Sequence, residues 1–97
     1  MPKVIFLPNA LRNLDKLRGF LALHDKASAA RASRVILNAT HALQHYPLLG
    51  RPCAGLPEYR DLVVPFGASS YIIRCRIEGE TVNIVAVKHA KEAGFSG

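Results

Sequence analysis

A chain of 97 residues is long enough for one folded domain and too short for two. Apolar residues make up 49% of it, which is enough to build a hydrophobic core without disulfides or a structural metal. The formal charge of +6 favours acidic partners such as nucleic acid, an anionic membrane or an acidic protein segment, although a solvated basic surface would carry the same charge.

The ends and the cysteines of the chain indicate its compartment. The apolar N-terminal run, residues 1–8, is too short for a signal peptide, and no window approaches the roughly 20 apolar residues of a membrane span. Cys53 and Cys75 occur without a CxxC motif. One bridge between them stays open, but reduced thiols in a cytoplasmic protein are the simpler interpretation. We therefore expect a single cytoplasmic domain covering residues 1–97.

A short strand at 3–7 and two amphipathic helices are predicted for the first half of the chain. The pattern is helical from Asn9, and Pro8 suits the first turn of this helix. Its apolar stripe consists of Leu11, Leu14, Leu17 and Leu21. A break at 25–28 precedes a second helix, which Pro47 ends and whose stripe consists of Ala32, Val35, Ile36, Ala39 and Leu43. Because the break is short, the helices should form an antiparallel hairpin.

In the second half of the chain, apolar and polar residues alternate, which is typical of strands. Residues 48–58 contain two glycines and two prolines and are predicted to be a loop. Strands are predicted at 61–66, 71–77 and 81–87, with turns at Gly67 and Gly79. In the middle strand Arg74 and Arg76 should share the face opposite the apolar row. The fold class is α+β, in the order β-α-α-β-β-β, with a helical hairpin packed on a mainly antiparallel sheet.

Basic residues on or just after the last three predicted strands form the first candidate site. They are Arg60, Arg74, Arg76, Lys88, His89 and Lys91. Such a set can bind RNA phosphates or acidic side chains. Spacing alone favours the solvated face of a half-exposed sheet. The tyrosines at 46, 59 and 71 could stack on bases, but packing at the edge of the core is favoured.

Motifs for metal binding or nucleophilic catalysis are weak or absent. His41 and His45 have the i, i+4 spacing of two metal ligands, but no third ligand is evident, so two solvent-facing histidines are favoured. Ser69 and Ser70 lack a GxSxG frame, and the sequence has no phosphate-binding GxxxxGK[ST] motif. We expect no metal and no cofactor.

The order of these elements resembles the RelE/ParE superfamily of bacterial toxins, and most of all its ParE, or plasmid-stabilisation, branch. The similarity rests on Tyr46-Pro47-Leu48-Leu49-Gly50-Arg51-Pro52 after the second helix, on Leu56-Pro57-Glu58-Tyr59-Arg60-Asp61-Leu62-Val63-Val64, on the run from Ser70 to Glu80, and on Val82 to Val87 followed by Lys88-His89. It covers nearly the whole chain. It implies a toxin that is neutralised by a cognate antitoxin, whose acidic, amphipathic C-terminal segment wraps it. DNA would be contacted only indirectly, through the antitoxin, and no membrane would be involved.

The superfamily has two activities, and the resemblance bears on the choice between them. RelE-like members cleave messenger RNA in the ribosome with basic residues and often a C-terminal tyrosine, whereas ParE-like members inhibit DNA gyrase and lack that catalytic set. Here Ile72 follows Tyr71 where RelE-like enzymes commonly have arginine, and Phe95 stands where a catalytic tyrosine would be expected. The resemblance thus implies a non-enzymatic gyrase inhibitor that acts by protein–protein contact.

Two alternatives stay open. One is a ribosome-dependent endoribonuclease, in which Arg60, Lys88 and His89 would be the catalytic groups, His89 as acid or base. The other is an inactive toxin relic that acts only as an antitoxin-binding module.

Overall fold

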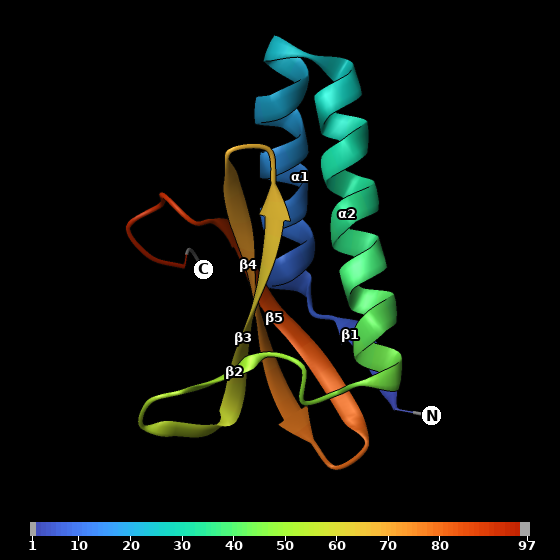
Figure 1. Cartoon of the computed structure of the whole chain (residues 1–97), viewed down its shortest axis with the longest axis vertical. Coiled ribbons are helices and arrows are strands. Elements are labelled where there is room, and N and C mark those ends of the chain that lie inside the picture. Colours follow the sequence, from blue (N-terminus) through green and yellow to red (C-terminus); the bar gives the residue numbers. More distant parts are fainter. Residues whose placement is uncertain (1, 96–97) are drawn as a thin grey trace.

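A helical hairpin lies against one face of a five-stranded sheet in the computed structural model, which describes residues 2–95 (Figure 1). The elements are β1 (Lys3–Phe6), α1 (Pro8–His24), α2 (Lys26–His45), β2 (Arg51–Cys53), β3 (Leu56–Phe66), β4 (Ser69–Glu78) and β5 (Thr81–His89). The predicted α+β class and the helical hairpin are confirmed. Asp25 separates the two helices and caps α2, since its carboxylate accepts hydrogen bonds from the Ala27 amide at 3.0 Å and the Ser28 hydroxyl at 2.8 Å.

The strand order in the sheet is β1-β5-β4-β3-β2. Only β1 and β5 are parallel among the strands of the described residues; the other neighbours are antiparallel, as predicted. Arg74 of β4 pairs with Ala86 of β5, while the next residue, Cys75, pairs with Ile84. Val85 is therefore an extra residue on β5, a β-bulge that bends the strand locally.

The core lies between the hairpin and the sheet. The alternation of β4 is confirmed, because Tyr71, Ile73 and Cys75 are buried and Arg74 and Arg76 lie on the other face. Helix residues that reach the core are Ala10, Ala32, Ile36 and Leu43, and the strands contribute Val64, Tyr71, Ile73, Cys75, Val82, Ile84 and Val87.

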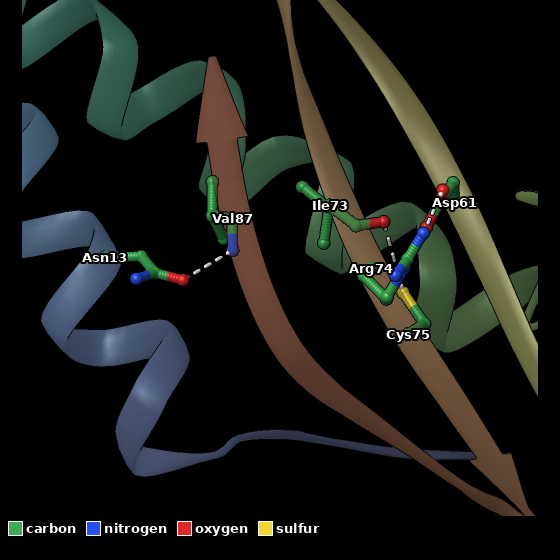
Figure 2. A network of polar contacts seen from close by, with 6 residues as sticks. All are labelled: Asn13, Asp61, Ile73, Arg74, Cys75 and Val87. Atoms are coloured by element: carbon green, nitrogen blue, oxygen red, sulfur yellow. Dashed lines mark hydrogen bonds and ion pairs between the residues drawn. The ribbon is translucent and has the colours of Figure 1, made fainter. Parts of the chain in front are cut away.

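The stripe of α1 differs from the prediction at two positions. Leu11 is half exposed, and Asn13 is buried. The reason is the edge of β5: β1 ends opposite Ile84, so the edge of β5 beyond it has no strand beside it. Asn13 reaches from α1 and accepts a hydrogen bond from the Val87 amide at 3.0 Å (Figure 2). Asn9, one turn earlier, donates to the Val85 carbonyl at 3.1 Å. Two asparagines thus take the place of a paired strand.

The predicted loop at 48–58 is wrong in part. Residues Arg51–Cys53 form the short strand β2, and β3 begins at Leu56 rather than at 61. Gly55, with φ of 76°, makes the tight connection between them. Proline is tolerated in β2 because this strand is at the edge of the sheet and needs hydrogen bonds on one side only. The glycines and prolines hid the strand pattern.

No helix within residues 2–95 is long and apolar enough to cross a membrane.

Candidate partner-binding surfaces

The six predicted basic residues lie in three separate places. Arg74, Arg76 and Lys88 lie on the face of the sheet that is turned away from the helices, which we call the basic face. Arg60 supports the turn after α2. His89 and Lys91 line a groove on the helix side. Strand pairing explains the division, because neighbouring residues along a strand point to opposite faces.

Arg74 is held on two sides by the chain itself. Its Nε and Nη2 atoms donate to the two carboxylate oxygens of Asp61 on β3, at 2.9 and 3.0 Å (Figure 2). These hydrogen bonds raise the pKa of the Arg74 guanidinium. Its Cζ lies 4.3 Å from the centre of the Phe95 ring, a cation–π contact. Both the edge and one face of the guanidinium are therefore occupied.

The other two cations of the basic face also have partners within the chain. Arg76 forms an ion pair with Glu78. Lys88 Nζ donates to the Glu92 carbonyl at 2.9 Å and lies 5.5 Å from the centre of the Phe95 ring. The segment after β5 thus folds back so that Phe95 covers part of this face.

Beside Arg74, the basic face has a shallow hollow of about 420 Å³, which Ile72, Asp61 and Cys53 help to line. Burial, and then the neighbouring Asp61 carboxylate, raise the pKa of the Cys53 thiol, so it stays protonated near neutrality. Cys53 and Cys75 are both free thiols. The Cys53 thiol therefore does not supply a thiolate to this hollow near neutral pH.

Arg60 acts on the backbone of the turn that follows α2. Its Nη1 donates to the carbonyls of Leu48 at 3.0 Å and Gly50 at 2.8 Å. Its side chain shares the sheet face of its neighbour in β4, Cys75, and not that of Arg74. The structure thus places Arg60 away from the basic face and gives it a positioning role.

An apolar groove with a volume of about 560 Å³ lies between the second half of α1 and the ends of β3, β4 and β5. Its lining residues are Asn13, Lys16, Leu17, Phe20, Leu21, Phe66, Tyr71, Val87, His89, Lys91 and Glu92. The tip of the helical hairpin extends beyond the sheet (Figure 1), so the apolar stripe of α1 is only partly covered there. Sequence periodicity predicts the stripe but not where the sheet ends.

His89 and the residues after it form one wall of the groove. The His89 ring packs edge-on against Tyr71, with 5.6 Å between ring centres. The His89 amide donates to Glu92 Oε1 at 2.9 Å, and its Nδ1 accepts from the Lys91 amide at 3.1 Å. With Lys16 on the opposite wall, the apolar floor is flanked by cations, which suits an apolar segment that carries carboxylates.

Stacking by Tyr71 and metal binding find little support. Tyr71 is 2% exposed, and burial raises the pKa of its hydroxyl, so it packs in the core as expected and does not stack on bases. His41 and His45 are exposed on α2. Across residues 2–95 there is no group of three or more His, Cys, Asp or Glu that could hold a metal ion.

Comparisons with known proteins agree with this architecture. Residues 4–94 match the family model described as ParE toxin of the type II toxin–antitoxin system parDE. The chain is 32% identical to toxin RelE1 of Caulobacter vibrioides over 89 residues, covering 92% of this chain and 94% of that one. It is 34% identical to toxin RelE3 of the same organism, covering 95% and 98%.

Solved structures show the same fold. The chromosomal ParDE toxin–antitoxin system from P. aeruginosa includes a chain with a TM-score of 0.75 at 20% identity, covering 94% of this chain and 98% of that one. The toxin–antitoxin complex RelBE2 from Mycobacterium tuberculosis includes one with a TM-score of 0.58 at 28% identity, covering 92% and 99%. The predicted superfamily is confirmed: this chain belongs to the ParE toxin family of type II toxin–antitoxin systems, within the RelE/ParE superfamily.

Proposed function

We propose that this toxin inhibits DNA gyrase by protein–protein contact and is neutralised in the cytoplasm by a cognate antitoxin. The observation that carries the choice of gyrase is the separation of the residues a ribonuclease would use. Arg60 holds the turn after α2, Lys88 lies on the basic face, and His89 lies in the groove on the other side of the sheet. A catalytic site must bring its groups within hydrogen-bond reach of one reacting phosphate.

The surroundings of the basic face support the same choice. Phosphoryl transfer needs cations aimed at the developing charge and an acid or base beside them. Arg74 and Arg76 are paired with carboxylates, and Ile72 and Phe95 beside Arg74 carry no group that can transfer a proton. The Tyr59 hydroxyl, which lies opposite Arg76, is bonded to that guanidinium. We assign this face to partner contact rather than to chemistry.

An RNA-cleaving activity is the second candidate. Two of the relatives are named RelE toxins, and His89 is a residue type that can serve as an acid or base near neutral pH. In that case Arg60, Lys88 and His89 would have to come together when the ribosome binds. A toxin relic that only binds antitoxin is the third.

The antitoxin is assigned to the apolar groove. Apolar side chains of α1, β3 and β5 form its floor, and Lys16 and Lys91 stand at its sides. An amphipathic segment with acidic residues matches both features. DNA would be reached only through the antitoxin.

The deciding experiment induces the toxin without its antitoxin and measures two things. We expect purified gyrase to lose supercoiling activity or to be trapped on cleaved DNA, while primer extension on ribosome-bound messages finds no new cuts. Codon-positioned cuts together with normal supercoiling would show that the toxin is an endoribonuclease and not a gyrase inhibitor. Unimpaired growth with neither effect would identify the relic.

A further inference from the structure

The turn between α2 and β2 is firmly built, yet its large side chains face solvent. Tyr46 is 67% exposed, Leu48 58% and Leu49 48%. The Leu49 amide bonds to the Tyr46 carbonyl at 3.1 Å, so the three side chains project from one closed turn. Large apolar side chains that are gathered in one exposed place on a small protein often form a binding surface.

The backbone of this turn is held from beneath at two points. Gly50 is buried, and a Cβ there would stand 3.1 Å from the carbonyl carbon and oxygen of Asp61, so the turn packs directly on β3. Arg60 holds the carbonyls of both Leu48 and Gly50. A turn fixed in this way loses little conformational entropy when it binds, which favours affinity.

We propose that this turn, Tyr46 to Gly50, is the toxin's contact with its protein target, and that it inserts into an apolar pocket rimmed by carboxylates. This inference rests on the proposed function and names the part of the toxin that performs it. The turn itself contains no cation, so it is not built to bind phosphates. Leucine and tyrosine side chains on a rigid turn fit a protein pocket. The exposed Arg51 that follows them, on a chain of charge +6, favours an acidic rim.

The turn is also well separated from the groove assigned to the antitoxin. Strand β3 runs from Arg60, beside the turn, to Phe66, in the groove wall. Six steps of an extended strand span about 20 Å. In Figure 1 the segment after α2 lies at the end of the molecule opposite the hairpin tip. A partner at the turn and an antitoxin segment in the groove therefore touch different residues.

The test replaces the two leucines of the turn and uses two other exposed leucines as a matched control. Leu48→Ser/Leu49→Ser is compared with Leu23→Ser/Leu37→Ser, since Leu23 is 84% and Leu37 50% exposed on the helices. The readouts are growth arrest on induction, inhibition of purified gyrase, and affinity for the purified product of the adjacent reading frame as antitoxin. The melting temperature of each variant shows that the fold is kept.

For the turn variant we expect growth arrest to be lost. Half-inhibition of gyrase should need about 10-fold more toxin, because truncating the anchor residues of an interface typically costs at least this much affinity. Antitoxin affinity should change less than about 2-fold, within the range of ordinary surface substitutions. Toxicity equal to that of the control variant would overturn the proposal, and so would an equivalent loss of antitoxin affinity. If the wild type arrests growth without affecting gyrase, gyrase is the wrong target, and the role of the turn is then tested by growth arrest alone. A wild type without any toxicity would also contradict the proposal that the turn contacts a target.

Discussion

At the scale of single residues, Arg74 shows why a list of cations does not describe a binding surface. Its two hydrogen bonds to Asp61 and its contact with Phe95 occupy most of its binding capacity within the chain. An ion pair that is partly buried contributes little net stability, because desolvation offsets the attraction between the charges. Sequence spacing could place Arg74 on the exposed face, but the partner 13 positions away is visible only in the folded pairing of β3 and β4.

Cys75 is a residue whose titration is coupled to folding. It is buried among β4 neighbours, and burial raises the pKa of its thiol from the ordinary 9.0 to about 12. Below pH 9 the thiol is neutral in both the folded and the unfolded protein, so its contribution to stability is complete. Above pH 9 the unfolded thiol ionises while the folded one does not. Stability is then lost as the pH rises from about 9 toward 12.

We predict that Cys75→Ala flattens the alkaline loss of stability. The expected change is up to about 1.4 kcal/mol per pH unit, the value for one titrating proton, measured as the free energy of unfolding by urea at pH 8 to 10. Staying at or below pH 10 limits the contribution of Tyr71, whose pKa burial also raises from 10.0. Cys53→Ala is the control and should keep most of the slope, because Cys53 is less buried. A Cys75→Ala slope equal to that of the wild type would contradict the prediction.

At the scale of elements, the sequence predicts the pieces with strong periodicity and misses those defined by pairing. The stripe of α2 and the alternation of β4 are simple repeats, and both are confirmed. Strand β2 is too short to show a period and contains Pro52, so local pattern could not reveal it. The burial of Asn13 depends on where β1 ends, and the bulge at Val85 depends on the pairing of β5 with β4. Both are properties of the sheet and not of a single segment.

The basic face gives the prediction for this scale. We expect the acidic antitoxin segment to continue from the groove onto the rim of the basic face, where the cations paired within the chain still give a positive surface. Arg74→Glu/Arg76→Glu should then weaken antitoxin binding by about 10-fold, because one reversed charge that faces a partner carboxylate costs on the order of 1–3 kcal/mol. Affinity is measured by titration with the purified antitoxin. Undiminished affinity would show that the face is merely solvated.

A control is needed because Glu at 74 would face Asp61 across the strands. The charge swap Asp61→Arg/Arg74→Glu restores an ion pair at the same place. If the charge swap recovers the melting temperature of the wild type, any loss of stability in Arg74→Glu/Arg76→Glu comes from breaking the pair of residues 61 and 74. The affinity of Arg74→Glu/Arg76→Glu for the antitoxin is then compared at a temperature where that variant is fully folded.

At the scale of the whole molecule, the helical hairpin is displaced along the sheet, so that its tip extends beyond the strands (Figure 1). The apolar groove lies where the half of the hairpin near its tip passes the ends of the strands. The turn after α2 lies at the opposite end of the molecule (Figure 1). The sequence predicts both amphipathic helices and the six basic residues. It does not predict that the basic residues lie on different surfaces. The position of each side chain depends on strand register and on contacts between residues far apart in the sequence, such as those of Arg60 with Leu48 and Gly50.

We expect the antitoxin to raise the melting temperature of the toxin by filling this groove. At a partner concentration of 100 Kd the gain is about 2.7 kcal/mol, which corresponds to roughly 10–20 °C for a domain of this size. Thermal melts with and without antitoxin measure it. Phe20→Ser, an exposed position in the groove wall, should reduce the gain, whereas Leu23→Ser, outside the wall, should not. An unchanged melting temperature at saturating antitoxin would rule the groove out.

The asparagine contacts of α1 have a consequence for how other chains can join this sheet. Beyond the end of β1, the edge of β5 would be a template for strand addition, the route to open-ended aggregation. Asn9 and Asn13 occupy the Val85 carbonyl and the Val87 amide, and Glu92 occupies the His89 amide. A peptide entering the groove beside this edge therefore finds these three backbone groups already bonded, which favours binding through side chains over extension of the sheet. The same contacts disfavour strand-to-strand polymerisation of toxin copies along it.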